Sequence, residues 1–161
     1  MPALAQNDTA TVAAEVHRSG DTTHTPVTTV LSGDRVHGKA TVSGNNGVPT
    51  GSVSFFLFAN GDCSGGVGNA TFLGDIPLDA AGVAHPSGDS NPLAAGSWSI
   101  LARYGGDPTY LQTESCAPFT VLDASAPIVV TEVHDSNHNP IVAPVLEGVT
   151  VHDQATVSGT M

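Results

Sequence analysis

Histidine is the residue type in this sequence with the most evident capacity for chemistry. Seven histidines occur among the 161 residues, and imidazole nitrogens commonly ligate zinc, copper and nickel. His17 and His37 would share an ion if strand pairing placed them on neighbouring strands. Their separation is not that of a compact zinc motif, and no Cys or Glu stands at a short fixed spacing to complete one. The sequence therefore favours imidazoles that cap turns and form cross-strand hydrogen bonds, with His17 and His37 kept as candidate metal ligands.

Acidic turn residues are the second kind of candidate ligand. Asp62 lies in a glycine-rich turn, Asp107 in a Gly-Gly-Asp-Pro turn, and Asp135 at the junction after a strand-like run. Calcium takes such hard oxygen ligands, but no D-x-[DN]-x-[DN]-G loop is present. Asp is also common in turns because its carboxylate bonds its own backbone. We expect no cofactor, with calcium at Asp107 or Asp135 as the alternative.

Catalysis has little support in the sequence. Ser, His and Asp are abundant, but no G-x-S-x-G nucleophile motif occurs. Aromatic residues make up only 5% of the chain, which also weakens a carbohydrate-binding interpretation. We expect no enzyme.

The two cysteines, Cys63 and Cys116, are far apart, and neither has a His or a second Cys at metal-ligand spacing. A disulfide between them is the preferred interpretation, and two unpaired buried thiols are the alternative. A disulfide indicates an oxidising compartment. Closing a loop of this length stabilises a fold by about 4 kcal/mol in the chain-entropy treatment.

Charge excludes several partners. The net charge is −11, from 15 acidic residues against 4 Lys and Arg. Binding to a phosphate backbone needs clusters of basic residues, so nucleic acid is excluded and an anionic membrane surface is disfavoured. No apolar run reaches the roughly 18 residues that membrane insertion requires. The 18 Gly and 11 Pro, together with many Thr and Val, indicate an all-β chain.

One stretch of the sequence occurs twice, in the same order. The first copy contains Glu15-Val16-His17, His24, Val30-Leu31-Ser32-Gly33, Val36-His37 and Ala40-Thr41-Val42-Ser43-Gly44. The second contains Glu132-Val133-His134, His138, Val145-Leu146-Glu147-Gly148, Val151-His152 and Ala155-Thr156-Val157-Ser158-Gly159. The offset is 117 residues at the start and 115 at the end. This predicts a repeat of about 115 residues followed by the start of another.

The repeat divides the chain into four parts. Residues 1–10 form an N-terminal tail or the remnant of a signal peptide, since Ala3-Leu4-Ala5 has the form of a cleavage site. Residues 11–122 form the complete domain, residues 123–129 a linker, and residues 130–161 the first strands of a partial second repeat.

Strand-like runs alternate with turn residues throughout the complete domain. We expect strands over 11–17 and 26–31 (one broken strand), 36–43, 51–59, 70–78, 82–86, 98–104 and 116–122. Alternation places five residues in the core: Val42, Phe55, Trp98, Ile100 and Tyr104. Seven to eight short strands without helical periodicity predict an antiparallel immunoglobulin-like β-sandwich.

The chain resembles the immunoglobulin-like repeats found in tandem in large bacterial surface proteins. The resemblance rests on the segments 36–44, 49–55, 93–100 and 102–110. It implies a secreted or cell-surface spacer or adhesive module, whose partners are neighbouring copies and an unknown surface ligand. It implies no activity, because this sandwich hosts unrelated functions.

Two alternative functions remain open. The partial repeat could donate strands to another molecule and build an extracellular filament through Val133, Val145, Val151 and Val157. More weakly, the loops at the sandwich ends could bind calcium or a glycan.

Overall fold

A computed structural model describes residues 8–124, 128–142, 144 and 146–158 of the chain. The chain divides into two compact units, residues 1–123 and 124–161. The tail or signal-peptide remnant expected at the N-terminus lies, up to residue 7, outside the described residues, as does Val145.

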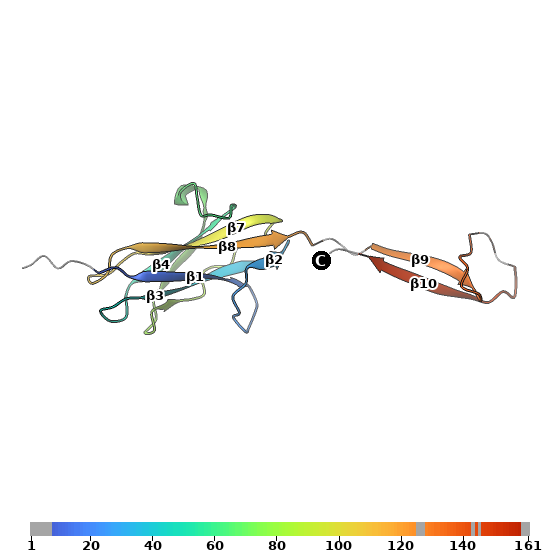
Figure 1. Ribbon diagram of the computed structural model, residues 1–161, viewed down its shortest axis with the longest axis horizontal. Coiled ribbons are helices and arrows are strands. Elements are labelled where there is room, and N and C mark those ends of the chain that lie inside the picture. The colour runs from blue at the N-terminus through green and yellow to red at the C-terminus, as the bar shows by residue number, and fades with distance from the viewer. Residues whose placement is uncertain (1–7, 125–127, 143, 145, 159–161) are drawn as a thin grey trace, which may run out of the picture. The chain divides into compact units, whose positions relative to one another are not determined.

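The first sheet of unit 1 has three antiparallel strands, in the order β1-β3-β6 (Figure 1). They are β1 (Thr11–Arg18), β3 (Val36–Ser43) and β6 (Val83–Ala84). β1 and β3 pair along their full lengths, from Thr11 opposite Ser43 to Arg18 opposite Val36. This complete ladder fixes which side chains of β1 and β3 lie directly opposite one another.

The second sheet has five strands, in the order β2-β8-β7-β4-β5. They are β2 (Thr29–Leu31), β8 (Thr113–Leu122), β7 (Gly96–Tyr104), β4 (Ser52–Phe58) and β5 (Thr71–Pro77). β2 pairs with β8 in parallel, and the other pairs are antiparallel. A short 3₁₀ turn, Val67–Asn69, precedes β5. The run expected as one broken first strand is therefore divided between the two sheets.

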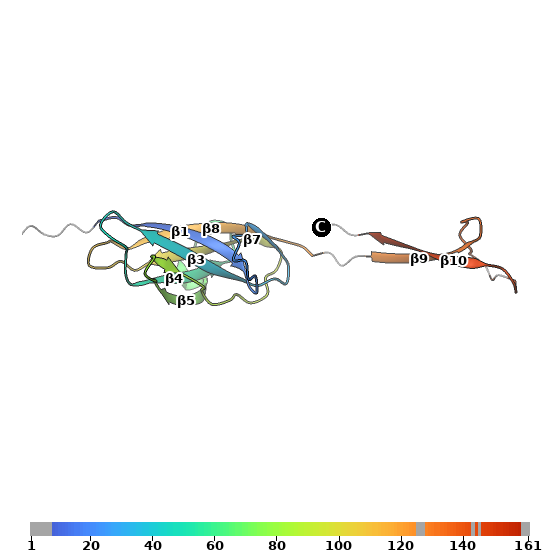
Figure 2. The ribbon, with the colours of Figure 1, turned by 90° about the horizontal axis from the view of Figure 1, so that it is seen from below.

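The two sheets pack face to face (Figures 1 and 2). The side chains between them form one hydrophobic core. The first sheet contributes Val36 and Val42, and the second contributes Phe55, Ile100 and Tyr104. The predicted fold class, an immunoglobulin-like β-sandwich of seven to eight strands, is confirmed.

Trp98 differs from its predicted place inside the sandwich. It is only partly buried and packs against the margin of the core. Its indole Nε1 donates a hydrogen bond of 2.9 Å to the Ala94 carbonyl. Trp98 lies near the beginning of β7, next to the exposed Gly96 and Ser97. Alternation directs its side chain toward the core, but its place at the end of the strand leaves it partly exposed.

Unit 2 is an antiparallel hairpin of β9 (Ile128–Asp135) and β10 (Val151–Ser158). Its register matches that of β1 and β3, with His134 opposite His152 as His17 is opposite His37. Three hairpin valines that correspond to the core residues Val16, Val36 and Val42 are exposed: Val133, Val151 and Val157. Within the described part of unit 2, the hairpin reproduces the pairing of the first two long strands of unit 1.

The boundaries of the units differ by a few residues from the sequence-based ones. Asp8 bridges to Tyr110 and Ala10 is buried, so the sandwich includes residues expected in the tail. β9 starts at Ile128, inside the expected linker.

Among the described residues, no helix is long and apolar enough to cross a membrane.

Candidate metal centre

Four histidine side chains converge beside the first sheet of unit 1. Each offers one ring nitrogen, and these four atoms lie within 4.8 Å of one another. We call this group the four-histidine cluster: His17, His24, His37 and His85.

The pairing of β1 with β3 brings two members together. His17 and His37 are direct cross-strand partners, and the neighbouring pair of Val16 and Gly38 faces the core. Because side chains alternate along a strand, both imidazoles project from the opposite, outer face. Their rings stack with centroids 5.7 Å apart and an interplanar angle of 17°.

A turn after β1 returns His24 to the cluster. Its backbone is left-handed, with φ of 50°, a conformation that non-glycine residues adopt rarely and in which His is enriched. The Asp21 carboxylate accepts hydrogen bonds from the backbone N–H and the hydroxyl of Thr23, at 2.8 and 2.7 Å. Two residues after His24, Pro26 bridges back to His17. The turn is therefore anchored on both sides of His24.

His85 enters from the other edge of the sheet, directly after β6. Its Nε2 lies 3.1 Å from Nε2 of His37. Its ring centroid lies 4.8 Å from that of His24. The cluster thus unites three chain segments, around residues 17–24, 37 and 85.

His17 is the most deeply buried member, with none of its surface exposed. Its Nε2 lies 3.2 Å from the Glu15 carboxylate, whereas its Nδ1 is buried without a hydrogen-bond partner among the described residues. A buried polar atom left without a partner costs about 1–3 kcal/mol. Such an exception calls for a specific explanation, and a role of this nitrogen as a metal ligand is one.

Two of the imidazoles each have a carboxylate next to a ring nitrogen. Glu15 contacts His17 and accepts a hydrogen bond of 2.9 Å from Lys39. Asp89 has an oxygen 3.5 Å from Nδ1 of His37. The hydrogen bond from Lys39 is the main cause that holds the pKa of Glu15 below its ordinary value, against the opposing effect of burial. Glu15 therefore stays ionised next to His17.

The pKa values of two of the imidazoles, those of His37 and His85, are lowered, which favours their neutral form. Burial is the largest cause that lowers the pKa of His37, and the charges of His17 and His24 lower it further while Asp89 opposes them. Burial followed by the nearby imidazoles lowers the pKa of His85. Metal ligation requires unprotonated nitrogens, so His37 and His85 offer imidazoles in the form that binds cations.

The structure brings together two of the four candidate ligands predicted from sequence, His17 and His37. The other two lie elsewhere and organise turns. Asp107 accepts hydrogen bonds from the backbone N–H groups of Thr50, Thr109 and Tyr110 at 2.7–2.8 Å. Asp135 accepts them from Asn137 and Asn139. Their oxygens serve the backbone, as Asp commonly does in turns.

His24 and His85 were missing from the candidates. His24 lies in an irregular turn whose path the sequence does not specify, although its recurrence as His138 was a usable signal. His85 has no counterpart among residues 130–161, and no residue spacing links it to the other three.

Unit 2 repeats three quarters of this arrangement. His134 and His152 are cross-strand partners with ring centroids 5.7 Å apart. His138 has φ of 65° and an Nδ1 atom 3.0 Å from Nε2 of His152. Oε2 of Glu132 lies 3.3 Å from Nε2 of His134, just as Oε2 of Glu15 lies 3.2 Å from Nε2 of His17. Pro140, two residues after His138, bridges back to His134.

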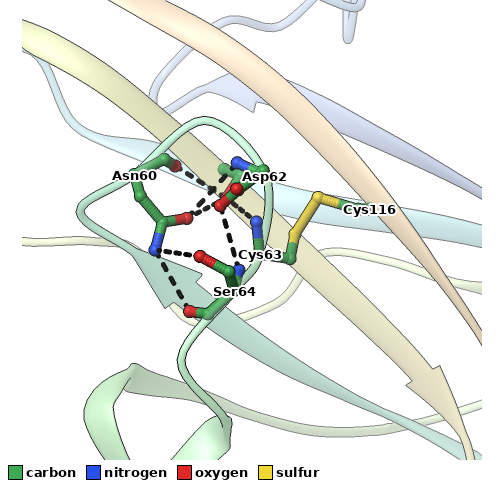
Figure 3. Close-up of a disulfide and its surroundings, with 6 residues drawn as sticks. Asn60, Asp62, Cys63, Ser64 and Cys116 are labelled. Carbon is green, nitrogen blue, oxygen red and sulfur yellow. Dashed lines mark hydrogen bonds between the residues drawn. A yellow bond between two sulfur atoms is a disulfide. The ribbon is translucent and has the colours of Figure 1, made fainter.

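The Cys63–Cys116 disulfide belongs to the second sheet (Figure 3). It joins the turn after β4 to β8, with a Cα–Cα distance of 6.0 Å. Asn60 and Asp62 shape this turn: the Asp62 carboxylate accepts from the Ser64 N–H at 3.1 Å, and the Asn60 amide donates to the Ser64 carbonyl at 3.1 Å. Asp62, considered above as a calcium ligand, is thus part of the turn.

The eight-stranded sandwich of unit 1 defines the chain as an immunoglobulin-like protein. Residues 22–122 match the family described as the bacterial Ig-like domain, group 3, and the chain belongs to this family. The matched stretch begins after β1, so His17 precedes it while His24, His37 and His85 fall within it. No curated protein and no solved structure matches the chain.

Proposed function

We propose that this chain is a non-catalytic structural or adhesive repeat of a secreted or cell-surface protein, one member of a tandem array of like modules. Its immediate partners are neighbouring copies. Membership of the bacterial Ig-like family supports a structural surface module, because such domains commonly occur in surface or exported proteins.

The observation that carries this proposal is the shared register of the two units. β9 and β10 reproduce the pairing of β1 with β3 residue by residue, including the histidine pair. Val133, Val151 and Val157 are 48%, 43% and 67% exposed, whereas the corresponding Val16, Val36 and Val42 are at most 3% exposed. The hairpin therefore has the pattern of a core face without its opposing sheet, as expected for the beginning of another module.

The disulfide supports export. Stable disulfides are typical of secreted and cell-surface proteins and rare in the reducing cytosol. Cys63 and Cys116 are joined, and no free cysteine occurs among the described residues.

A chimaera tests the repeat interpretation. Residues 45–122 are added after Gly159, the counterpart of Gly44. The hairpin should then complete a second sandwich, and the amides of Val133 and Val157 should gain protection from hydrogen exchange. As a matched control, the same segment is added with Phe55 and Ile100 replaced by Asp, which removes the new core. Equal exchange in the two fusions would contradict the proposal.

A second function is favoured by the exposed hairpin valines. A head-to-tail interaction, in which the hairpin packs on the sheet of another molecule, does not close and builds a filament. This predicts concentration-dependent polymers in light scattering and negative-stain microscopy. Val133→Asp with Val157→Asp should abolish them, whereas Gln154→Asp with Thr156→Asp, on the opposite face of the same hairpin, serves as the control. A chain that stays monomeric at high concentration supports the array module instead.

A further inference from the structure

We propose that the four-histidine cluster binds one divalent transition-metal ion, with Zn²⁺ as the representative, through one ring nitrogen of each imidazole. This inference is independent of the role of the module in an array, and nothing in the family assignment carries it.

The spacing of the nitrogens is the first support. All four lie within 4.8 Å of one another, and the two Nε2 atoms of His37 and His85 are 3.1 Å apart. Zinc–nitrogen bonds of about 2.0–2.1 Å in a tetrahedron place the ligand atoms about 3.3–3.4 Å from each other. One pair is already near this distance, and none of the other pairs exceeds 4.8 Å.

The unsatisfied nitrogen of His17 is the second support. Its Nε2 faces the Glu15 carboxylate, so the proton belongs on Nε2 and the lone pair on Nδ1. That Nδ1 is buried and has no hydrogen-bond partner among the described residues. A metal ion shared with His37, whose ring is stacked 5.7 Å away, would give this atom its partner.

The carboxylates beside the imidazoles are the third support. Metal-binding histidines usually donate their other ring N–H to a carboxylate or carbonyl, which fixes the tautomer and strengthens the ligand. Glu15 holds this position for His17, and Asp89 lies 3.5 Å from Nδ1 of His37. Lys39 and Ser19 in turn donate to these two carboxylates.

The ligand set selects the class of ion. Four imidazole ligands suit zinc, copper and nickel, whereas calcium and magnesium require oxygen ligands. Four protein ligands leave no open position on a tetrahedral ion, so the site is structural rather than catalytic. An ion there would tie the turn of His24 and the segment of His85 to β1 and β3.

The partial copy in unit 2 supplies an independent comparison. His134, His138 and His152 repeat the strand pair, the left-handed turn residue and the carboxylate behind the first histidine. This half-site has three imidazoles and should bind the same ion more weakly. A complete array would then carry one metal ion per module.

The test is calorimetric titration of the intact, disulfide-bonded full chain with Zn²⁺ at neutral pH. We expect one tight site per chain. His24→Ala with His85→Ala should weaken it by more than about 100-fold, beyond the 10–100-fold typical of changes around the ligands. The matched control, His138→Ala with His152→Ala in unit 2, should keep the tight site. Co²⁺ in place of Zn²⁺ should give the intense visible absorption of tetrahedral coordination in the wild type and the control only.

Melting in a chelator checks that each variant folds. His24 is exposed on a turn, so His24→Ala alone provides a second variant that retains the fold and should lose at least about 10-fold in affinity. No tight binding by the wild type would overturn the proposal. So would tight binding that survives His24→Ala with His85→Ala, or that is lost equally in the unit 2 control.

Discussion

His17 and His37 face each other across β1 and β3, stacked at 5.7 Å, and His134 and His152 hold the same register on β9 and β10. A shift of the strands by one residue would turn one histidine of each pair to the other face of its strand, which in unit 1 is the core face. In unit 1 the neighbouring cross-strand pair, Val16 and Gly38, fixes this register. Val16 is buried in the core, and Gly38 lies against Phe55. The geometry of the four-histidine cluster is therefore a direct product of core packing.

Gly38→Ala should destabilise unit 1. A Cβ at this position would lie 2.6 Å from Cδ1 of Phe55 and 3.2 Å from Cγ2 of Ile100, both in the core. Overpacking of this kind costs about 1–3 kcal/mol, measurable by urea unfolding. Gly68→Ala is the control, because a Cβ there meets no atom within 4 Å. Equal stability of the two variants would show that Phe55 moves aside without cost.

Removal of the disulfide should lower the free energy of unfolding by about 4 kcal/mol. Cys63 and Cys116 are separated by 53 residues, and the estimate follows from the entropy of closing a loop of that length. Cys63→Ser with Cys116→Ser should match the wild type measured under reducing conditions. Adding reductant to the double variant should change nothing, and any further loss would point to an effect other than the disulfide.

Asp107 should make unit 1 sensitive to acid. The hydrogen bonds from Thr50, Tyr110 and Thr109 hold the pKa of its carboxyl well below the ordinary value, the backbone N–H of Thr50 being the largest cause. A lowered folded-state pKa stabilises the fold at pH values above the ordinary pKa of Asp, and this contribution is lost as pH falls toward the folded-state value. Asp107→Asn should therefore lower the Tm at pH 7 by several degrees, and the difference from the wild type should narrow in acid. The control is Asp153→Asn on the exposed hairpin, and a constant difference at all pH values would contradict the prediction.

Tyr104 should ionise unusually late. Burial, followed by the hydrogen bond and the charge of Asp107, raises its pKa to about 12. A raised folded-state pKa means that the stabilisation is complete below the ordinary tyrosine pKa and is lost as pH rises toward 12. The ultraviolet absorbance of tyrosinate should show a component near pH 12 that Tyr104→Phe removes. If this component persists in Tyr104→Phe, it belongs to another group.

The strands were the part of the fold most accessible from sequence. Val36–Ser43 coincides with β3, because period-two alternation and flanking turn residues mark it on both sides. The separation of β1 from β2 was not predictable in the same way. Alternation shows which side chains face inward but not which neighbour a strand pairs with, and β2 joins the opposite sheet in parallel with β8.

Only two of the four histidines in the cluster could be proposed as ligands from the sequence, for a related reason. His17 and His37 lie on strands, where pairing made their approach a reasonable hypothesis. His24 depends on the path of a turn held by Asp21 and Pro26, and His85 on an edge strand of two residues. These are tertiary features that no short-range spacing encodes.

The parallel pairing of β2 with β8 has a mechanical consequence for a chain of such modules. Tension applied to the two ends of the sandwich first loads the pairing of β1 with β3. It then pulls β2 and β8 in opposite directions along their own axes, so the hydrogen bonds of residues 29–31 with 120–122 are loaded together rather than one at a time. After these hydrogen bonds break, the Cys63–Cys116 disulfide still closes the loop between the two cysteines, which are 53 residues apart in sequence. The disulfide therefore prevents about 180 Å of further extension. A stretched module would therefore lengthen by a limited amount and keep its central strands tethered for refolding.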